Sequence, residues 1–121
     1  MDQKAFHMTL LFDFYGDLLT DRQKEFYDLY HNEDLSLAEI AENAGITRQG
    51  VRDVLVRAEN TLEELEEKTG IVRRFLVVRS GLNAIEEAAK RIETLNQGAL
   101  NSSELAGLVK TIQETVDTLK E

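Results

Sequence analysis

The sequence of 121 residues contains no cysteine, no proline and no tryptophan. Without cysteine the chain can form no disulfide and no thiolate metal site, and without proline its helices meet no obligatory break. Its apolar runs fall far short of the roughly 20 residues that a membrane-spanning helix needs. The start of the chain, MDQKAFHMTLLF, lacks the basic stretch and cleavage site of a secretory signal. We therefore expect a helical, cytoplasmic protein of one domain that is not inserted in a membrane.

Charge is unevenly distributed along the chain, whose formal net charge is −9. Residues 1–44 carry three basic and ten acidic side chains, residues 45–80 carry seven and six, and residues 81–121 carry four and seven. Because phosphate binding depends on lysine and arginine, the acidic total argues against tight binding of nucleic acid. The middle stretch is the one part that is not net acidic, so it is the candidate surface for such a ligand.

The clearest pattern covers residues 36–58, SLAEIAENAGITRQGVRDVLVRA, and predicts two helices joined by a tight turn. Ser36 and Glu39 have the spacing of a capping box at the start of the first helix. Gly45 supplies a left-handed residue that ends this helix, and Thr47 can cap the next one. Apolar residues follow one side of both helices: Leu37, Ile40, Ala41, Ala44, Val51, Val54, Leu55 and Ala58. This arrangement is typical of a helix-turn-helix, and the alternative is a helical hairpin that only packs.

The second helix of this motif is the candidate recognition helix, expected to run from Thr47 to about Lys68. A helical wheel places Arg48 and Arg57 at its flanks and the following side chains opposite the core: Gln49, Arg52, Asp53 and Val56. Arginine and glutamine can reach base edges, arginine also binds phosphates, and aspartate accepts from the cytosine amino group. Glutamates crowd the last turns, so only the first half can approach DNA. The alternative is a solvated polar face.

Residues 3–19, QKAFHMTLLFDFYGDLL, predict a helix whose apolar arc exceeds the roughly 100° that a surface helix needs. The surplus favours either contact with a second subunit or a central helix wrapped on all sides within a monomer, and the pattern leaves both open. Thr20 is the expected N-cap of a second helix. The lone His7 and the polar turn 31–34 lack metal-ligand spacing, so we expect packing or surface roles for them.

After Gly70, two heptad patterns predict two more helices separated by a turn at residues 96–102. The first pattern is Ile71, Phe75, Val78, Leu82, Ile85, Ala89 and Ile92, and the second is Leu105, Val109, Ile112, Val116 and Leu119. Such seams require partner helices, which an antiparallel hairpin or packing between subunits would provide. We therefore expect a helix-turn-helix domain over residues 1–70 and a C-terminal helical hairpin over residues 71–121. The hairpin packs on that domain, as one compact unit, or on a second subunit, and we favour a homodimer.

No pattern in the sequence predicts catalysis. The chain lacks a glycine-rich phosphate loop, a His-x-x-x-His motif and a nucleophile set beside a base. Its many carboxylates recur at i, i+3 or i+4 spacing, which is typical of a solvated helix face. We therefore expect a protein that is not an enzyme and that uses no cofactor or metal.

The run LTDRQKEFYDLYHNEDLSLAEIAENAGITRQGVRDVLVRAENTL resembles region 4 of bacterial sigma-70 factors, whose helix-turn-helix reads the −35 promoter element. With the preceding LLFDFYGDLL, the chain resembles the YlxM-type family (UPF0122) of small helix-turn-helix proteins from residue 6 to about residue 70. The resemblance implies an all-α fold, a sigma-70 region 4-like helix-turn-helix with an N-terminal helix and a C-terminal helical extension. Members are typically encoded beside genes of the signal recognition particle, which implies a regulatory or accessory role in that pathway.

The motif and the resemblance together give these candidate DNA-binding residues: Thr47, Arg48, Gln49, Arg52, Asp53 and Arg57. One hypothesis is a dimeric transcription regulator whose two recognition helices enter successive major grooves, with half-sites about 34–36 Å apart. The other is an interaction module that binds the protein or RNA of the signal recognition particle and no DNA. Its candidates for RNA phosphates are Arg48, Arg52, Arg73, Arg74 and Arg79. The acidic flanks and Asp53 in the middle of the recognition face depart from a sigma region 4, and they predict weak DNA binding.

Overall fold

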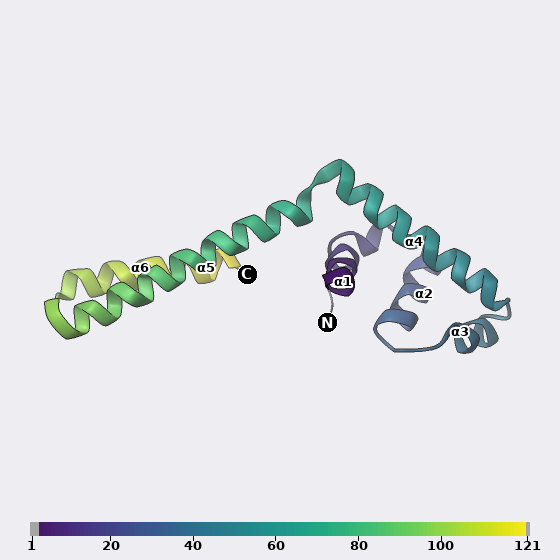
Figure 1. Cartoon of the computed structure of the whole chain (residues 1–121), viewed down its shortest axis with the longest axis horizontal. Coiled ribbons are helices and arrows are strands. Elements are labelled where there is room, and N and C mark those ends of the chain that lie inside the picture. Colours follow the sequence, from purple (N-terminus) through teal and green to yellow (C-terminus); the bar gives the residue numbers. More distant parts are fainter. Residues whose placement is uncertain (1–2, 121) are drawn as a thin grey trace. The chain divides into compact units, whose positions relative to one another are not determined.

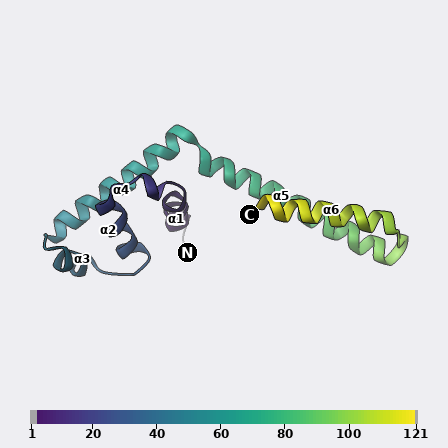
Figure 2. The ribbon, with the colours of Figure 1, turned by 180° about the vertical axis from the view of Figure 1, so that it is seen from behind.

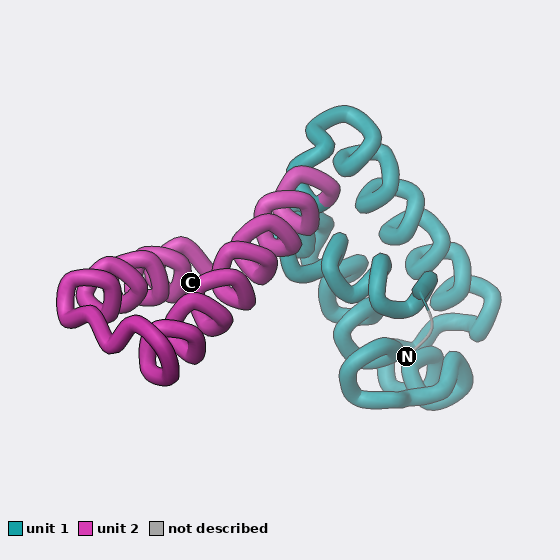
Figure 3. Tube along the Cα trace, turned by 60° about the vertical axis from the view of Figure 1, so that its left-hand side comes forward, with its two compact units in different colours: residues 1–72 teal, residues 73–121 magenta. Residues whose placement is uncertain are grey.

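The computed structural model describes residues 3–120, and the regular structure within that range is entirely helical (Figure 1). The elements are α1 (Gln3–Tyr15), the 3-10 helix η1 (Gly16–Leu18), α2 (Asp21–His31), α3 (Leu37–Ala44), α4 (Arg48–Thr69), α5 (Ile71–Leu95), the π-helical turn η2 (Asn96–Leu100) and α6 (Ser103–Lys120). The all-α fold expected from the sequence is confirmed. The chain forms two compact units, Met1–Val72 and Arg73–Glu121 (Figure 3). The expected packing of the C-terminal hairpin on the first domain or on a second subunit stays a prediction.

The first unit is built on α4, which contacts α1, α2 and α3. Figures 1 and 2 show these three helices along one side of α4. The core contains the apolar stripes of all four helices, with Leu19 after η1 and Val72 from the start of α5: Met8, Leu11, Tyr15, Leu19, Phe26, Tyr27, Ile40, Ala41, Val51, Leu55, Ala58, Leu62 and Val72. The Tyr27 ring stacks between Phe12, at a centroid distance of 4.7 Å, and His31, at 4.1 Å. The helix-turn-helix therefore packs against α1 and α2 through one shared buried core.

The predicted helix starts are confirmed by their hydrogen bonds. At α3 the Glu39 N–H donates to Ser36 Oγ (3.1 Å) and the Ser36 N–H donates to Glu39 Oε1 (3.3 Å), which completes the capping box. Thr20 caps α2 in the same way with Gln23, a second capping box that sequence reasoning did not identify. Each capping box provides acceptors for backbone N–H groups that have no partner within the helix.

The first helix is shorter than the sequence predicted. It ends at Tyr15 instead of continuing to residue 19, and the 3-10 helix η1 follows from Gly16. Gly16 is buried, and a Cβ at this position would lie 3.2 Å from the Phe12 ring. The apolar arc is also not fully covered by the described chain, since Phe6, Phe14 and Leu18 remain exposed. Both explanations of this arc, a second subunit or a helix wrapped within a monomer, stay predictions.

The second unit is an antiparallel pair, with α5 and α6 side by side in both Figure 1 and Figure 2. Its turn is held by Asn96, which is buried and hydrogen-bonds Ser102 twice. The Ser102 N–H donates to Asn96 Oδ1 (2.7 Å), and Asn96 Nδ2 donates to the Ser102 carbonyl (2.9 Å). Ser102 Oγ in turn accepts the N–H of Leu105 (3.2 Å), as expected for the cap of α6.

The hairpin buries only part of the seams that the sequence predicted. On α5 it buries Leu82 and Ala89, and on α6 it buries Val109 and Val116. Four other residues of the α5 seam are spaced seven apart and remain exposed by 38 to 49%: Ile71, Val78, Ile85 and Ile92. One heptad row of α5 is therefore buried in the hairpin, and the adjacent row remains partly exposed.

Candidate nucleic-acid interface

A tight turn between α3 and α4 sets where the candidate recognition helix begins. Gly45 adopts the predicted left-handed conformation, with φ of 72°, and its N–H donates to the carbonyls of Ala41 and Glu42. The next N–H, of Ile46, donates to the Ala41 carbonyl at 3.1 Å. Thr47 Oγ1 then accepts the Gly50 N–H at 2.9 Å and caps α4. Arg48, the first residue of α4, therefore directly follows a turn whose backbone is held by hydrogen bonds.

The buried stripe of α4 decides which side chains face outward. Val51, Leu55 and Ala58 are buried against α1, α2 and α3, so the opposite side of the first half of α4 is open. The structure places all six predicted contact residues on exposed positions of this half or its cap: Thr47, Arg48, Gln49, Arg52, Asp53 and Arg57. Their role in binding stays a prediction, whereas their common exposure on one helix is a property of the fold.

Gln49 and Asp53 form a pair on this outward face. Gln49 Nε2 donates to Asp53 Oδ1 at 2.9 Å, across one helical turn. An ionised carboxylate only accepts hydrogen bonds, so it fixes the amide nitrogen of Gln49 toward itself. The second hydrogen on Nε2 and the amide oxygen remain directed away from the carboxylate. The sequence contained this signal, because a glutamine–aspartate pair at i, i+4 is a known stabilising pair on helices.

Three arginines surround this pair, and each is exposed: Arg48, Arg52 and Arg57. None of them forms an ion pair with a carboxylate among residues 3–120. Arg52 borders a surface hollow lined also by Tyr30, Leu37 and Val56, so it lies at the flank facing α2 and α3 and not in the middle of the face as the helical wheel suggested. The three guanidinium groups therefore remain available for an anionic partner.

The glutamates in the second half of α4 have structural roles that sequence reasoning missed. Glu66 Oε1 accepts from the Tyr15 hydroxyl (2.7 Å) and from the Val72 N–H (3.0 Å), so it joins α1 to the start of α5. Glu63 lies 3.2 Å from Nε2 of His7, and Glu59 lies 3.8 Å from Nε2 of His31. These carboxylates were expected on a solvated face. No local signal identifies them, because their partners are far away in the sequence.

The same carboxylates affect the phenol groups packed below them. Burial, together with the negative charges of Glu59 and Glu63, raises the pKa of Tyr27 to about 12. Burial likewise raises the pKa of the Tyr15 hydroxyl. The hydrogen bond with Thr69 opposes this shift in part, and Glu66 adds to it. Both phenols are therefore neutral at any physiological pH, and Tyr15 can donate its hydrogen bond to Glu66 throughout that range.

Neither a membrane-spanning segment nor a metal cluster is present in the described part of the chain. Between residues 3 and 120, no helix combines the length and the apolar character needed to cross a bilayer. The same residues contain no group of three or more histidine, aspartate or glutamate side chains placed to hold a metal ion.

A capped turn, a buried stripe and an exposed polar face on the following helix define this chain as a helix-turn-helix protein. It belongs to the family described as "Putative helix-turn-helix protein, YlxM / p13 like", whose model matches residues 2–101. A UPF0122 protein of Acetivibrio thermocellus is 42% identical over 118 residues, which are 98% of this chain and 97% of the relative. The UPF0122 protein YlxM of Bacillus subtilis is 35% identical over 112 residues, 93% and 96% of the two chains. A UPF0122 protein of Desulforamulus reducens is 58% identical over 73 residues, 60% and 62% of the two chains. The family resemblance seen in the sequence is thereby confirmed.

Proposed function

We propose that this protein is a DNA-binding regulator whose recognition helix is the first half of α4. The observation that carries the proposal is the exposed face on which Arg48, Arg52 and Arg57 surround the hydrogen-bonded pair of Gln49 and Asp53. In a helix-turn-helix, the second helix enters the major groove with its N-terminal residues at the base edges. The arginines suit phosphates or guanine, and the glutamine suits adenine. Such a role also requires the cytoplasmic location that the sequence predicts.

The Gln49–Asp53 pair gives the proposal a specific base preference. Glutamine recognises adenine by accepting from the N6 amino group and donating to N7. Because Asp53 holds one Nε2 hydrogen, it leaves Gln49 with a free oxygen and one free N–H on adjacent atoms, which is the pattern that adenine requires. Asp53 is therefore a positioning residue that orients Gln49, and its negative charge also weakens binding to phosphates in general.

The test is fluorescence anisotropy with labelled DNA from upstream of the protein's own gene, beside scrambled DNA of equal length, at two salt concentrations. We expect sequence-preferring binding that weakens with salt, because phosphate contacts release counterions. The double variant Arg48→Ala/Arg52→Ala should lose this binding and keep its helical content. The matched control is Arg91→Ala/Lys110→Ala, which removes two exposed positive charges from the second unit and should change the affinity less than about twofold.

Two results would contradict DNA binding by α4. One is full affinity in the Arg48→Ala/Arg52→Ala variant, and the other is equal loss in the Arg91→Ala/Lys110→Ala control. A loss confined to the α4 variant supports the interface, because the two variants carry the same change in net charge.

Asp53→Ala separates base readout from phosphate contact. Removing the carboxylate should strengthen binding to scrambled DNA several-fold, since one negative charge leaves the interface. Because Gln49 also loses its orientation, the preference for the specific sequence should fall about tenfold, in the range of one lost base contact. Anisotropy titrations with both DNAs measure the two effects together. An unchanged preference would show that Asp53 does not position Gln49.

A second candidate is an interaction module for the signal recognition particle, the pathway that the family resemblance implies. It is favoured by the acidity of residues 1–44, with three basic and ten acidic side chains beside the recognition helix. Such a surface suits a basic protein partner and opposes a DNA backbone. The same titration distinguishes the two candidates. Absence of binding to both DNAs at low salt, together with saturable binding to the purified particle, favours this second function.

A further inference from the structure

Each helix of the second unit carries a second heptad row beside the row that it buries in the hairpin. On α5 the small and apolar residues of this row recur at alternating spacings of three and four: Val78, Gly81, Ile85, Ala88, Ile92 and Leu95. On α6 the corresponding row is Leu105, Leu108, Ile112, Thr115 and Leu119. In the α5 row Ile85 is exposed by 48%, and in the α6 row Leu119 is exposed by 64%. Neither row contains a charged residue.

The two rows lie on the same face of the hairpin. Val78 and Ile85 precede the buried Leu82 and Ala89 by four residues, and Leu105 and Ile112 precede the buried Val109 and Val116 by four in the same way. In an antiparallel pair, equal offsets from the contact line point to the same side. Val78 and Leu119, one from each row, line the same hollow, together with Phe75, Leu82, Arg79 and Lys120. We call these two rows the hairpin apolar face.

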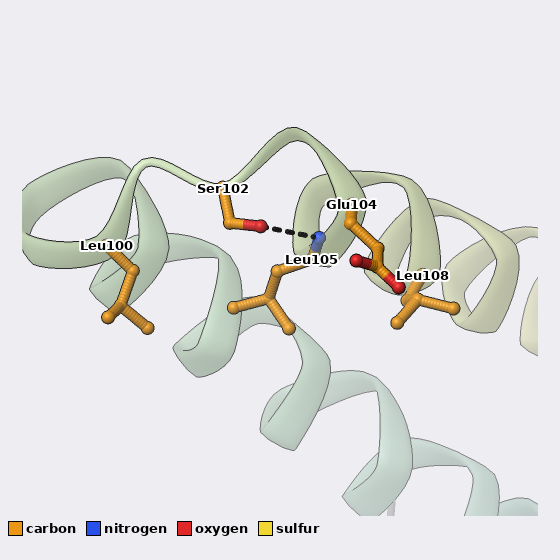
Figure 4. A pocket seen from close by; sticks show the side chains of 5 residues that line it. All are labelled: Leu100, Ser102, Glu104, Leu105 and Leu108. Carbon is orange, nitrogen blue, oxygen red and sulfur yellow. Dashed lines mark hydrogen bonds between the residues drawn. The ribbon is translucent and has the colours of Figure 1, made fainter.

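The hairpin apolar face extends to the tip of the hairpin. Figure 4 shows Leu100, Leu105 and Leu108 pointing to the same side, with Glu104 beside Leu108. These side chains line a shallow, open hollow at the start of α6. The face thus continues over the length of α6 and ends at an acidic side chain.

The other side of the hairpin is polar and satisfied within the chain. Lys120 Nζ donates to Asn83 Oδ1 (2.7 Å) and lies 3.4 Å from Glu86 Oε2, and Gln113 Nε2 donates to Glu93 Oε2 (3.3 Å). Glu86, Glu93, Gln113 and Lys120 follow the buried residues by four positions, where the apolar face precedes them by four. One side of the pair is therefore closed by its own hydrogen bonds, and the opposite side presents unpaired apolar surface.

We propose that the hairpin apolar face binds the same face of a second copy of this chain, so that two hairpins pack antiparallel, with α5 of each copy lying on the hairpin of the other. A helix that contacts two neighbouring helices needs two heptad rows. Here the hairpin uses one row of each helix, and the second row on both helices requires a partner with two helices of similar length and the same period. A second copy supplies this surface by two-fold symmetry.

Charge at the two ends of the face fixes the direction of the pairing. Arg74 continues the α5 row by one step at the open end of the hairpin, and Glu104 lies at the tip. Neither residue forms an ion pair with another residue in the range 3–120. The described part of α6 ends opposite Asn83 and Glu86 of α5, which Lys120 contacts. A two-fold axis near this level and perpendicular to the helices lays the first turns of α5 of each copy along the hairpin of the other, with Arg74 near the tip that carries Glu104 of the other copy. The two residues cannot meet within one hairpin, because they lie at its opposite ends.

The first test measures the molar mass of the full-length protein by sedimentation equilibrium over roughly a hundredfold range of concentration. The wild-type protein should be a dimer. Ile85→Asp, at the centre of the face, should raise the dimer dissociation constant about 100-fold or more, because it would bury an unpaired charge. Thr118→Asp adds the same charge to an exposed position of α6 outside the face and should leave dimerisation unchanged. A monomeric wild-type protein, or a dimer that is insensitive to Ile85→Asp, would overturn the proposal.

The second test uses charge reversals, which leave the apolar contacts intact. Arg74→Glu or Glu104→Arg alone should weaken the dimer about tenfold, since each places two pairs of like charges together. The double reversal Arg74→Glu/Glu104→Arg should restore it, and only contact between copies can explain such a rescue. Failure of the double variant to recover would refute the antiparallel arrangement. Both tests are independent of DNA binding. This inference can therefore fail while the proposed function stands, and the proposed function can fail while this inference stands.

Discussion

The two units of this chain bury the apolar surface of their helices to different extents. In the first unit, apolar side chains of α1, α2, α3 and α4 converge on one core, in which Leu11, Ile40, Val51 and Leu62 are fully buried. In the second unit two longer helices pair along one line, and the apolar residues beside that line remain exposed. Two helices can cover only one side of each other, whereas four helices around a common core can cover all of their stripes.

The difference supports the proposal that the second unit associates with a second copy, whereas the first unit already has a closed core. An exposed apolar face of this length on a small unit marks an interaction site. The first unit has exposed apolar side chains too, such as Phe6 and Phe14 on α1, but these lie outside an already closed core. Loss of a buried residue should therefore unfold the first unit, whereas loss of an apolar residue in the second should affect association.

The largest expected effect contrasts one leucine from each unit. Leu62→Ala removes a fully buried side chain of α4 and should lower the free energy of unfolding by about 2–5 kcal/mol. Leu119→Ala, exposed on α6, should change the stability of the monomer by less than about 0.5 kcal/mol and weaken dimerisation. Urea denaturation followed by circular dichroism, at a concentration below dimerisation, measures both. Equal losses would refute the contrast between the two units.

A smaller effect is expected at the end of the first unit, where Glu66 joins three helices. Glu66→Ala leaves the Val72 N–H without its acceptor and the Tyr15 hydroxyl with Thr69 as its remaining partner. It should cost about 1–3 kcal/mol of unfolding free energy. Glu67→Ala, an exposed neighbour of equal charge, is the control and should be nearly neutral. If both variants unfold at the same urea concentration, Glu66 belongs to the solvated face that the sequence predicted.

The features that the sequence predicted correctly depend on neighbours within a turn. The Ser36 and Thr47 caps, the left-handed Gly45 and the buried stripe through Val51 and Leu55 each follow from spacings of three or four residues. The hydrogen bond between Gln49 and Asp53 has the same local origin and could have been predicted. Helix periodicity also places all six candidate site residues on exposed positions, although it gives no measure of their affinity for DNA.

The features that sequence reasoning missed depend on partners far away in the chain. The roles of Glu59, Glu63 and Glu66 require knowing which residues of α1, α2 and α5 approach α4. The end of α1 at Tyr15, before a Gly16 that lies against the Phe12 ring, also has no signal in the helical periodicity. A heptad pattern likewise shows that a helix needs partners, but it does not show which of two adjacent rows meets which helix.

Two glycines, one in each unit, should respond in opposite directions to the same substitution. Gly45→Ala puts a Cβ on a residue with φ of 72° in the helix-turn-helix and should cost about 1 kcal/mol. Gly107→Ala lies inside α6, where no heavy atom is within 4 Å of the added Cβ, and should stabilise by up to about 1 kcal/mol. Thermal denaturation of the two variants beside the wild-type protein measures the signs. Destabilisation by Gly107→Ala would show that α6 is more closely packed than a free hairpin face.

The smallest expected effect is a pH dependence that belongs to the first unit. Burial lowers the pKa of His31, and the nearby Glu59 carboxylate opposes this shift only in part. The ring of His31 also stacks on Tyr27, at a centroid distance of 4.1 Å, and packs edge-to-face against Tyr30, at 5.1 Å. Because its pKa is lower in the folded chain than in the unfolded chain, protonation favours unfolding.

The sign of this dependence can be measured directly. The contribution of neutral His31 is fully present above the unfolded pKa of about 6.5 and is lost as the pH falls through the lower, folded pKa. Urea denaturation at pH about 7.5 and about 5.5 should therefore show lower stability at the acidic pH. In His31→Gln this fall should be smaller, although the variant loses ring stacking at both pH values. The same fall in both proteins would place the titrating group elsewhere and remove His31 from the account of the first unit.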